Sequence, residues 1–175
     1  MKFIILGCGS SMGVPRVDGF FGECNPKNKK NYRTRCSALV SINNSNILID
    51  TSPDLRQQLL SQKITNIDIV LYTHMHADQT HGINDLRIFF LKNKKKIPVY
   101  ADILTSKYLK NNFSYCFKKK HDYPEILDLK KLKKNFSLGS KKTKINIKAI
   151  SVKHGFINSF AYFFNKKLAY ISDVN

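Results

Sequence analysis

The sequence predicts one α/β domain in which sheets and helices pack as a sandwich. Strand-like apolar segments occur early in the chain, helix-like segments follow, and strand-like segments return near the end. The 175 residues suffice for a sizeable core, and 42% hydrophobic with 24% charged residues are values of globular proteins. No internal repeat and no linker divides the chain, so we expect a single domain over residues 1–175.

Eight short apolar segments predict the strands of this fold. They are residues 2–6, 36–42, 46–50, 67–72, 97–100, 145–151, 159–164 and 167–172. The second and third of them predict a hairpin around residues 43–45. Residues 17–35 are polar, basic and turn-rich, which predicts a long loop.

Three segments predict helices. The first follows Ser52, which is placed to cap it, with Pro53 at the first helical position. The others are residues 83–91 and 104–113, where apolar side chains recur at helical spacing. Residues 116–144 are weakly patterned, and only loops and short, unassigned elements are predicted there.

Three of the five histidines fall within eight positions, directly after the predicted strand 67–72. In an extended segment side chains alternate, so His74, His76 and Asp78 are predicted to project from one side. Two imidazoles and a carboxylate are ligands for a metal such as zinc. The alternative is a polar strand end whose histidines only form hydrogen bonds.

The net charge of +18 indicates either a solvated basic surface or attraction of a phosphate-bearing substrate. The lysines occur in runs, and isoleucine and asparagine are abundant as well, which is typical of a compositional bias. We therefore favour the solvated surface, and nucleic acid stays a possible but unfavoured partner. His121 lies in one lysine-rich stretch, where a surface position is favoured over a ligand.

The cysteines and the N-terminus predict a cytoplasmic protein with no membrane partner. Cys8, Cys24, Cys36 and Cys116 contain no C-x-x-C pair, and the N-terminal apolar stretch is too short for a signal peptide. No run approaches the length of a membrane span. Reduced thiols are expected, with Cys8 and Cys36 as small core residues beside apolar strands.

Glycines 7, 9 and 13 follow the first predicted strand. Their G-x-G-x-x-x-G spacing differs from the dinucleotide fingerprint, and Pro15 does not open a helix. A tight turn that brings backbone amides toward a cleft is the favoured interpretation.

With these motifs the chain resembles the metallo-β-lactamase superfamily, and within it the PhnP-like cyclic phosphodiesterases, with ribonuclease Z as a more distant relative. The resemblance covers the whole chain. Its motifs are residues 7–16 (G-x-G-x-x-x-G-V-P), 33–37, 48–51, 73–82 (against H-x-H-x-D-H), 82–87, His154 and 170–173.

The resemblance implies a four-layer αββα sandwich with two metal ions, expected to be zinc, with manganese or iron as alternatives. By it His74, His76 and His154 hold the first ion, and Asp173 bridges to a second ion, which Asp78 also binds. Asp78 and Asp173 would thereby be catalytic. Two ions about 4 Å apart can share a hydroxide and clamp a phosphoryl centre.

The resemblance also places Asp50 behind the metal ligands, where it would orient the ligand loop.

Two features depart from the family pattern. Gln79 stands where the motif usually has a histidine for the second metal. If the segment turns helical at Asp78, His81 lies on the same face and either substitutes or only forms hydrogen bonds near the site. Family members also continue beyond Asn175, so we expect a C-terminally incomplete fold that could form a homodimer. Cys24 alone does not predict the extra structural zinc of some relatives.

Three functions are compared on this basis. The leading one is a metal-dependent phosphodiesterase acting on a small cyclic phosphate or nucleotide diester. The others are an RNA-processing nuclease of the ribonuclease Z type and an inactive fold remnant that binds metal or a partner. Arg16, Arg87 and Lys153 lie near the motifs and either contact a substrate phosphate or pair with acidic side chains.

Overall fold

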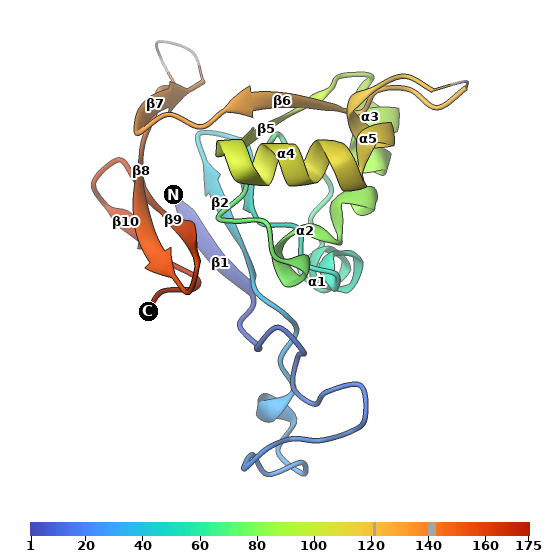
Figure 1. Cartoon of the computed structure of the whole chain (residues 1–175), viewed down its shortest axis with the longest axis vertical. Helices are drawn as coiled ribbons and strands as arrows, with labels where there is room; N and C mark the ends of the chain where they lie inside the picture. The colour runs from blue at the N-terminus through green and yellow to red at the C-terminus, as the bar shows by residue number, and fades with distance from the viewer. Residues whose placement is uncertain (121, 140–142) are drawn as a thin grey trace.

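In the computed structural model, two β-sheets pack face to face, and helices cover the outer face of one of them (Figure 1). The structure describes residues 1–120, 122–139 and 143–175. His121, predicted to be a surface residue, lies outside the described residues.

The first sheet has six strands in sequential order, β1 to β6. They are β1 (Lys2–Gly7), β2 (Ser37–Ile42), β3 (Ser45–Ile49), β4 (Ile69–Leu71), β5 (Ile97–Ala101) and β6 (Leu127–Lys131). β1, β2 and β3 pair antiparallel, and β3 to β6 pair parallel. The parallel strands β3 to β6 follow one another across the sheet in sequence order, so each connection between them is a crossover in the same direction. Since such crossovers are right-handed, all of their helices lie on the same face of the sheet.

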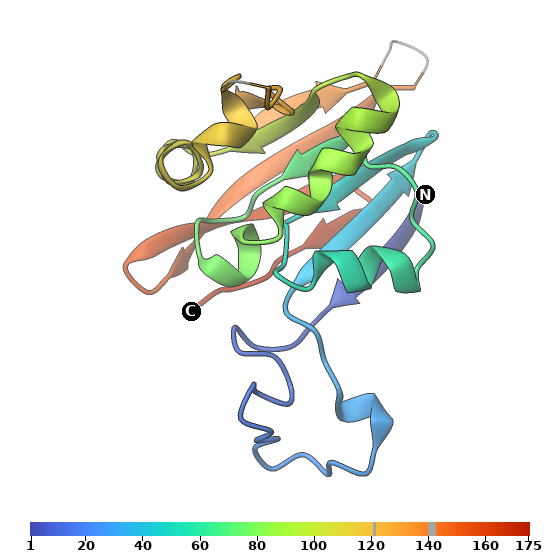
Figure 2. The same cartoon turned by 90° about the vertical axis from the view of Figure 1, so that its right-hand side faces the viewer.

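The helices lie together over that face (Figure 2). They are α1 (Leu55–Ser61), α2 (Ala77–Thr80), η2 (Ile83–Leu86), α3 (Arg87–Asn93), α4 (Ile103–Asn112) and α5 (Ser114–Phe117). The short 3-10 helix η1 (Lys29–Asn31) lies apart from them, in the long loop. The prediction that Ser52 caps the first helix is wrong, because α1 begins at Leu55 and its N-cap residue is Asp54. Ser52 lies in the turn before the helix, where its Oγ accepts from the Asp54 N–H. The helix predicted over residues 83–91 is divided into a 3-10 turn and α3.

The second sheet is antiparallel in the order β10-β9-β8-β7. Its strands are β7 (Asn135–Leu138), β8 (Ile145–His154), β9 (Ile157–Phe164) and β10 (Leu168–Tyr170). Along β8, Ile145, Ile147 and Ala149 are buried and alternate with exposed residues, as period-2 geometry requires for a half-covered sheet. These three side chains face the first sheet.

The core has two parts, one on each face of the six-stranded sheet. Val40 and Leu71 pack with Ile147, Tyr162 and Phe164 between the sheets. Leu39, Leu48, Leu55, Val70 and Leu86 belong to the cluster under the helices. The described residues thus form the α, β and β layers of the expected sandwich, and no helix among them covers the outer face of the four-stranded sheet (Figure 1).

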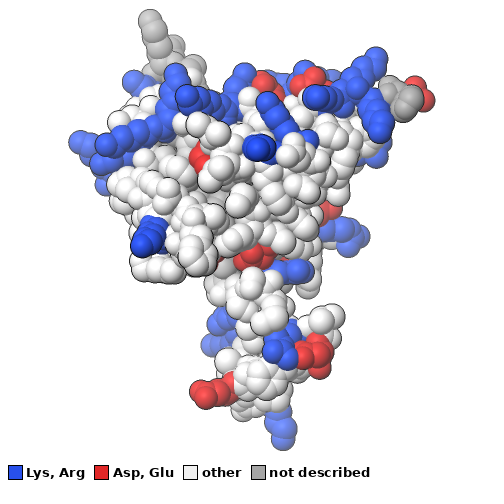
Figure 3. Space-filling view, viewed as in Figure 1, with Lys and Arg blue, Asp and Glu red and all other residues white. Residues whose placement is uncertain are grey.

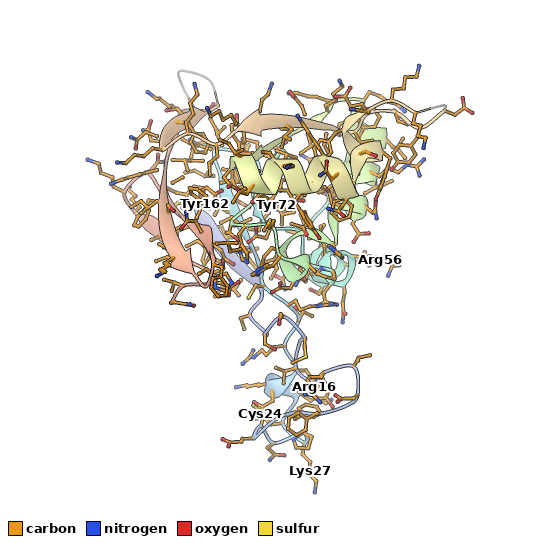
Figure 4. The ribbon with its side chains drawn as sticks, in the orientation of Figure 1. Arg16, Cys24, Lys27, Arg56, Tyr72 and Tyr162 are labelled. Atoms are coloured by element: carbon orange, nitrogen blue, oxygen red, sulfur yellow. The ribbon has the colours of Figure 1, made fainter. Side chains whose placement is uncertain are left out.

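The predicted loop between β1 and β2 protrudes from the body of the molecule (Figures 1 and 4). It carries Arg16, Cys24 and Lys27, well away from the sheets (Figure 4). Cys8, at its start, is exposed, so its prediction as a core residue is wrong, because β1 ends at Gly7 and the chain leaves the sheet there. Cys36 is half-buried.

Basic side chains are spread over the face seen in Figure 3, most densely along the side that carries β6 and β7. This distribution does not form one compact patch on that face. Within the described part of the chain, no helix has the length and apolar character needed to cross a membrane.

Candidate metal centre

Three imidazoles from two distant parts of the chain meet at one point. The Nε2 atom of His74 lies 3.0 Å from Nδ1 of His76, and Nε2 of His154 lies 3.3 Å from the same Nδ1. One ligand atom from each ring lies within 4.8 Å of those of the other two. Zinc–nitrogen bonds of about 2.0–2.1 Å at tetrahedral angles separate ligand atoms by about 3.3 Å. The three rings therefore fit one metal ion.

Contacts between the two sheets bring these histidines together. The Phe160 N–H of β9 donates to the Thr73 carbonyl oxygen over 3.0 Å. The Tyr162 hydroxyl donates to the buried Tyr72 carbonyl oxygen over 2.6 Å, and Figure 4 shows these two tyrosines side by side. The strand end that carries His74 is thus held against the β8–β9 hairpin, at whose tip His154 lies.

The extended run after β4 ends earlier than the alternation pattern predicts. α2 begins at Ala77, directly after His76, so Asp78 lies in the first turn of a helix and not in an extended segment. The prediction that side-chain alternation continues to Asp78 is therefore wrong. His74 is buried, Asp78 is half-buried and His76 is exposed, so the centre opens to solvent on one side.

A buried chain of hydrogen bonds orients His74 from behind. The Thr73 N–H and hydroxyl donate to the two carboxylate oxygens of Asp50, over 2.7 and 2.8 Å. Because the hydroxyl proton is directed to Asp50, Thr73 Oγ1 accepts from Nδ1–H of His74 at 3.0 Å. This tautomer leaves Nε2 of His74 without a proton and directed toward the other two rings.

The electrostatics favour the neutral imidazole that binds metals. Burial, and then the neighbouring His76, lower the pKa of His74 to about 4. Asp50 is fully buried, and this burial raises its pKa well above the usual range, against the two hydrogen bonds from Thr73. Asp50 thus occupies the position behind the ligand loop that the sequence predicts for it.

Asp173 lies beside His74, and the Gln79 side chain lies between Asp173 and Asp78. Asp173 Oδ2 is 3.5 Å from Nε2 of His74. The Gln79 side-chain Nε2 donates to Asp78 Oδ2 over 2.9 Å and to Asp173 Oδ2 over 3.1 Å. Burial, with a smaller effect of Asp173, raises the pKa of Asp78.

His81 is directed elsewhere. Its Nε2 lies 3.0 Å from the Tyr108 hydroxyl, and its ring packs edge-on against Phe113 at 5.4 Å between centroids. Because α2 ends at Thr80, the residue that follows it is turned toward α4. Of the two roles left open for His81, the structure favours hydrogen bonding over metal ligation.

Two of the three predicted substrate-binding cations, Arg16 and Arg87, have other partners. Arg16 forms an ion pair with Asp18 in the protruding loop. Arg87 lies over the Tyr123 ring at 4.4 Å, and Lys153 is exposed on β8, one residue before His154. Among the described residues, none of the three forms a hydrogen bond or ion pair with the side chains at the centre. Substrate contact by these residues stays a prediction.

Thr73 and Gln79 are contributors whose roles the sequence does not reveal. Thr73 is visible only as the residue between an apolar strand and the first histidine, and Gln79 only as a departure from a motif. Their roles follow from contacts with Asp50 and Asp173, which lie 23 and 94 residues away in the chain. No local pattern reports such contacts.

Residues 45–175 match the sequence profile described as a β-lactamase superfamily domain. The chain belongs to the metallo-β-lactamase superfamily. Its fold is also that of a diphosphatase from the PhnP family, with a TM-score of 0.81 and 28% identity over 99% of this chain and 66% of that one. Zinc-bound PqqB from Methylobacterium extorquens shares the fold, with a TM-score of 0.71 and 18% identity over 98% of this chain and 64% of that one.

Two curated relatives are similar in sequence. An octanoyltransferase from Porphyromonas gingivalis is 38% identical over 120 residues, which are 68% of this chain and 24% of the relative. A ribonuclease Z from Clostridium kluyveri is 30% identical over 97 residues, which are 54% of this chain and 27% of the relative. The chain thus spans about a quarter of the length of each curated relative.

Proposed function

We propose that this chain acts as a metal-dependent hydrolase of phosphodiesters, with a small cyclic phosphate or nucleotide diester as substrate. One observation carries the proposal: the convergence of His74, His76 and His154, with the tautomer of His74 set by Thr73. The likeness to a diphosphatase of the PhnP family supports a phosphate ester as the substrate class.

The donor set favours zinc, because three neutral imidazole nitrogens and one carboxylate are typical zinc ligands; manganese and iron are the alternatives. When bound, such an ion lowers the pKa of a coordinated water and neutralises charge on a phosphoryl group. We assign ligation to Nε2 of His74, Nδ1 of His76, Nε2 of His154 and Oδ2 of Asp173.

The chain's own residues supply orientation and a proton acceptor. Thr73, which donates to Asp50, holds the His74 ring in place. Nε2 of His74 is therefore already positioned before a metal ion binds. The Asp78 carboxylate, beside Asp173, is the group we propose to accept a proton from an attacking water. The net charge of +18 would attract an anionic substrate to the molecule as a whole.

A second candidate is an RNA-processing nuclease. The relationship to a ribonuclease Z favours it, and so does the basic charge. It predicts binding of structured RNA that weakens steeply as salt is raised, because each phosphate contact releases counterions. Electrophoretic shifts over a salt series separate this candidate from a hydrolase of small diesters.

The test is to measure the zinc content and the turnover of bis(p-nitrophenyl) phosphate on the full 175-residue chain. We expect bound zinc and turnover in the wild type and the loss of both in His76→Ala. His81→Ala is the matched control, since His81 contacts Tyr108, and it should keep both. A wild type without bound metal would refute the proposal. Bound metal without turnover of any diester would favour the inactive remnant.

A further inference from the structure

The carboxamide of Gln79 lies where two carboxylates face one another. Its Nε2 group carries two hydrogens, and the two acceptors within reach are Asp78 Oδ2 at 2.9 Å and Asp173 Oδ2 at 3.1 Å. By the family resemblance these carboxylates would hold a second cation. Here a neutral side chain of the protein links them instead.

Burial, backbone hydrogen bonds and close packing of the following turn fix the position of Gln79. The residue is fully buried, and its carbonyl oxygen accepts from the Thr51 N–H over 2.7 Å. Three residues later, the Gly82 N–H donates to the Thr51 carbonyl oxygen over 2.8 Å. A Cβ at Gly82 would come within 1.9 Å of the Ser52 carbonyl oxygen, so this turn is seated directly on residues 51–52. The backbone of Gln79 is therefore fixed, and its side chain is shielded from solvent.

The oxygen atom of the Gln79 side-chain amide shows which contacts hold the side chain in its orientation. Gln79 Oε1 is buried and has no hydrogen-bond partner in the described part of the chain. A buried acceptor without a partner is unfavourable, so the two bonds made by Nε2 must hold the group in this orientation. The reverse orientation would bring Oε1 against two carboxylate oxygens.

Among the residues that the structure describes, no other imidazole replaces the missing ligand. His81, the nearest candidate in sequence, is bound to Tyr108 at 3.0 Å and packs on Phe113. Asp173 Oδ2 lies between Nε2 of His74, at 3.5 Å, and Nε2 of Gln79, at 3.1 Å. Asp173 thus faces the three imidazoles on one side and the Gln79 amide on the other.

We propose that Gln79 takes the place of the second cation, so that this chain binds one metal ion, at the three imidazoles. The inference rests on the proposed function for that first ion. It makes Gln79 a positioning residue, because its amide fixes the carboxylates of Asp78 and Asp173 with hydrogen bonds.

The test counts metal ions and does not depend on turnover. The full chain is incubated with excess zinc and desalted, and its zinc content is read by native mass spectrometry and elemental analysis. We expect one ion in the wild type and two in Gln79→His, which restores an imidazole between the carboxylates. Two ions in the wild type would overturn the inference and would mean that the amide rotates to offer Oε1 as a ligand.

A second variant keeps the inference testable if Gln79→His does not fold. Gln79→Glu has the same shape, and its ionised form cannot donate, so at alkaline pH three carboxylates would face one another. We expect its melting temperature to fall in one equivalent of zinc and to recover when zinc is in excess, as a second ion binds. A Gln79→Glu protein with wild-type stability in one equivalent would overturn the inference.

The failure of the proposed function has a different signature. A wild type that binds no zinc would refute the three-imidazole site itself, and this inference with it. One ion in both the wild type and a folded Gln79→His would leave the first site intact and overturn the role of Gln79. The count of zero, one or two thus identifies which statement fails.

Discussion

Replacement of Thr73 by valine tests the hydrogen-bond chain behind the metal ligands. Valine keeps the shape of threonine but removes the hydroxyl that donates to Asp50 over 2.8 Å and accepts from Nδ1 of His74 at 3.0 Å. Both partners are buried and would be left incompletely paired. Packing is nearly unchanged, so the effect reports the hydroxyl alone.

The expected loss follows from these two bonds. A hydrogen bond to a charged group contributes about 1.5–3 kcal/mol and a neutral one about 1 kcal/mol. The loss is therefore about 2.5–4 kcal/mol with an ionised Asp50 and about 2 kcal/mol with a protonated one, a range of about 2–4 kcal/mol. Since burial raises the pKa of Asp50, the lower part of this range applies where Asp50 is protonated. For a chain of this size the melting temperature should fall by roughly 4–16 °C.

The metal affinity should fall as well, because the His74 ring is no longer held in the ligating tautomer. Loss of such a partner typically lowers affinity by about 10–100-fold. Competition with a chromogenic chelator measures the affinity, and calorimetry measures the melting temperature. Thr73→Ser keeps the hydroxyl and should stay close to the wild type. A Thr73→Val protein with wild-type affinity and melting temperature would refute the reasoning.

Three further predictions concern the ligands, the contact between the sheets and an ion pair. The double change His74→Ala and His76→Ala should abolish metal binding by elemental analysis and remove the stabilisation by the ion, about 2.7 kcal/mol at a hundred times Kd; unchanged metal content would contradict it. Tyr162→Phe should lower the free energy of unfolding in urea by about 1–3 kcal/mol, since it leaves a buried carbonyl on the other sheet unpaired; an unchanged midpoint would show that this contact is unimportant. Arg35 lowers the pKa of Asp54, so the pair is stabilising above the unfolded pKa of about 3.9 and is lost as the pH falls through the lower folded value. Asp54→Asn should therefore be less stable than the wild type by about 1 kcal/mol at neutral pH, and this difference should vanish in acid; a difference that persists in acid would contradict the assignment.

Local patterns in the sequence predict most elements of the fold. The strands β1, β2, β3, β5 and β9 lie within about two residues of the segments that their apolar content predicts, and β8 extends three residues beyond its predicted segment. The two strands missed, β6 and β7, are the edge strands of their sheets. Such strands pair on one side only and carry more polar residues, so their apolar pattern is weak.

The motif with His74, His76 and Asp78 can also be recognised from the sequence alone, and such motifs indicate the family. Its chemistry is local, because these residues lie within five positions and leave the same strand end. Even here the sequence misses one detail. The start of α2 at Ala77 turns Asp78 out of the extended run, which depends on the backbone of the whole segment.

Only the tertiary structure decides which side chains meet. His154 reaches His76 because β9, the partner strand of β8, forms hydrogen bonds to residues 72 and 73 after β4. His81 turns to Tyr108 because α4 lies beside it. The bonds from Gln79 to Asp173 join residues 94 positions apart. The physical reason is that periodicity reports which face of an element is buried, whereas the contacts of a site depend on how two sheets are docked. The sequence alone thus determined the ligands on offer, and the packing decided their partners.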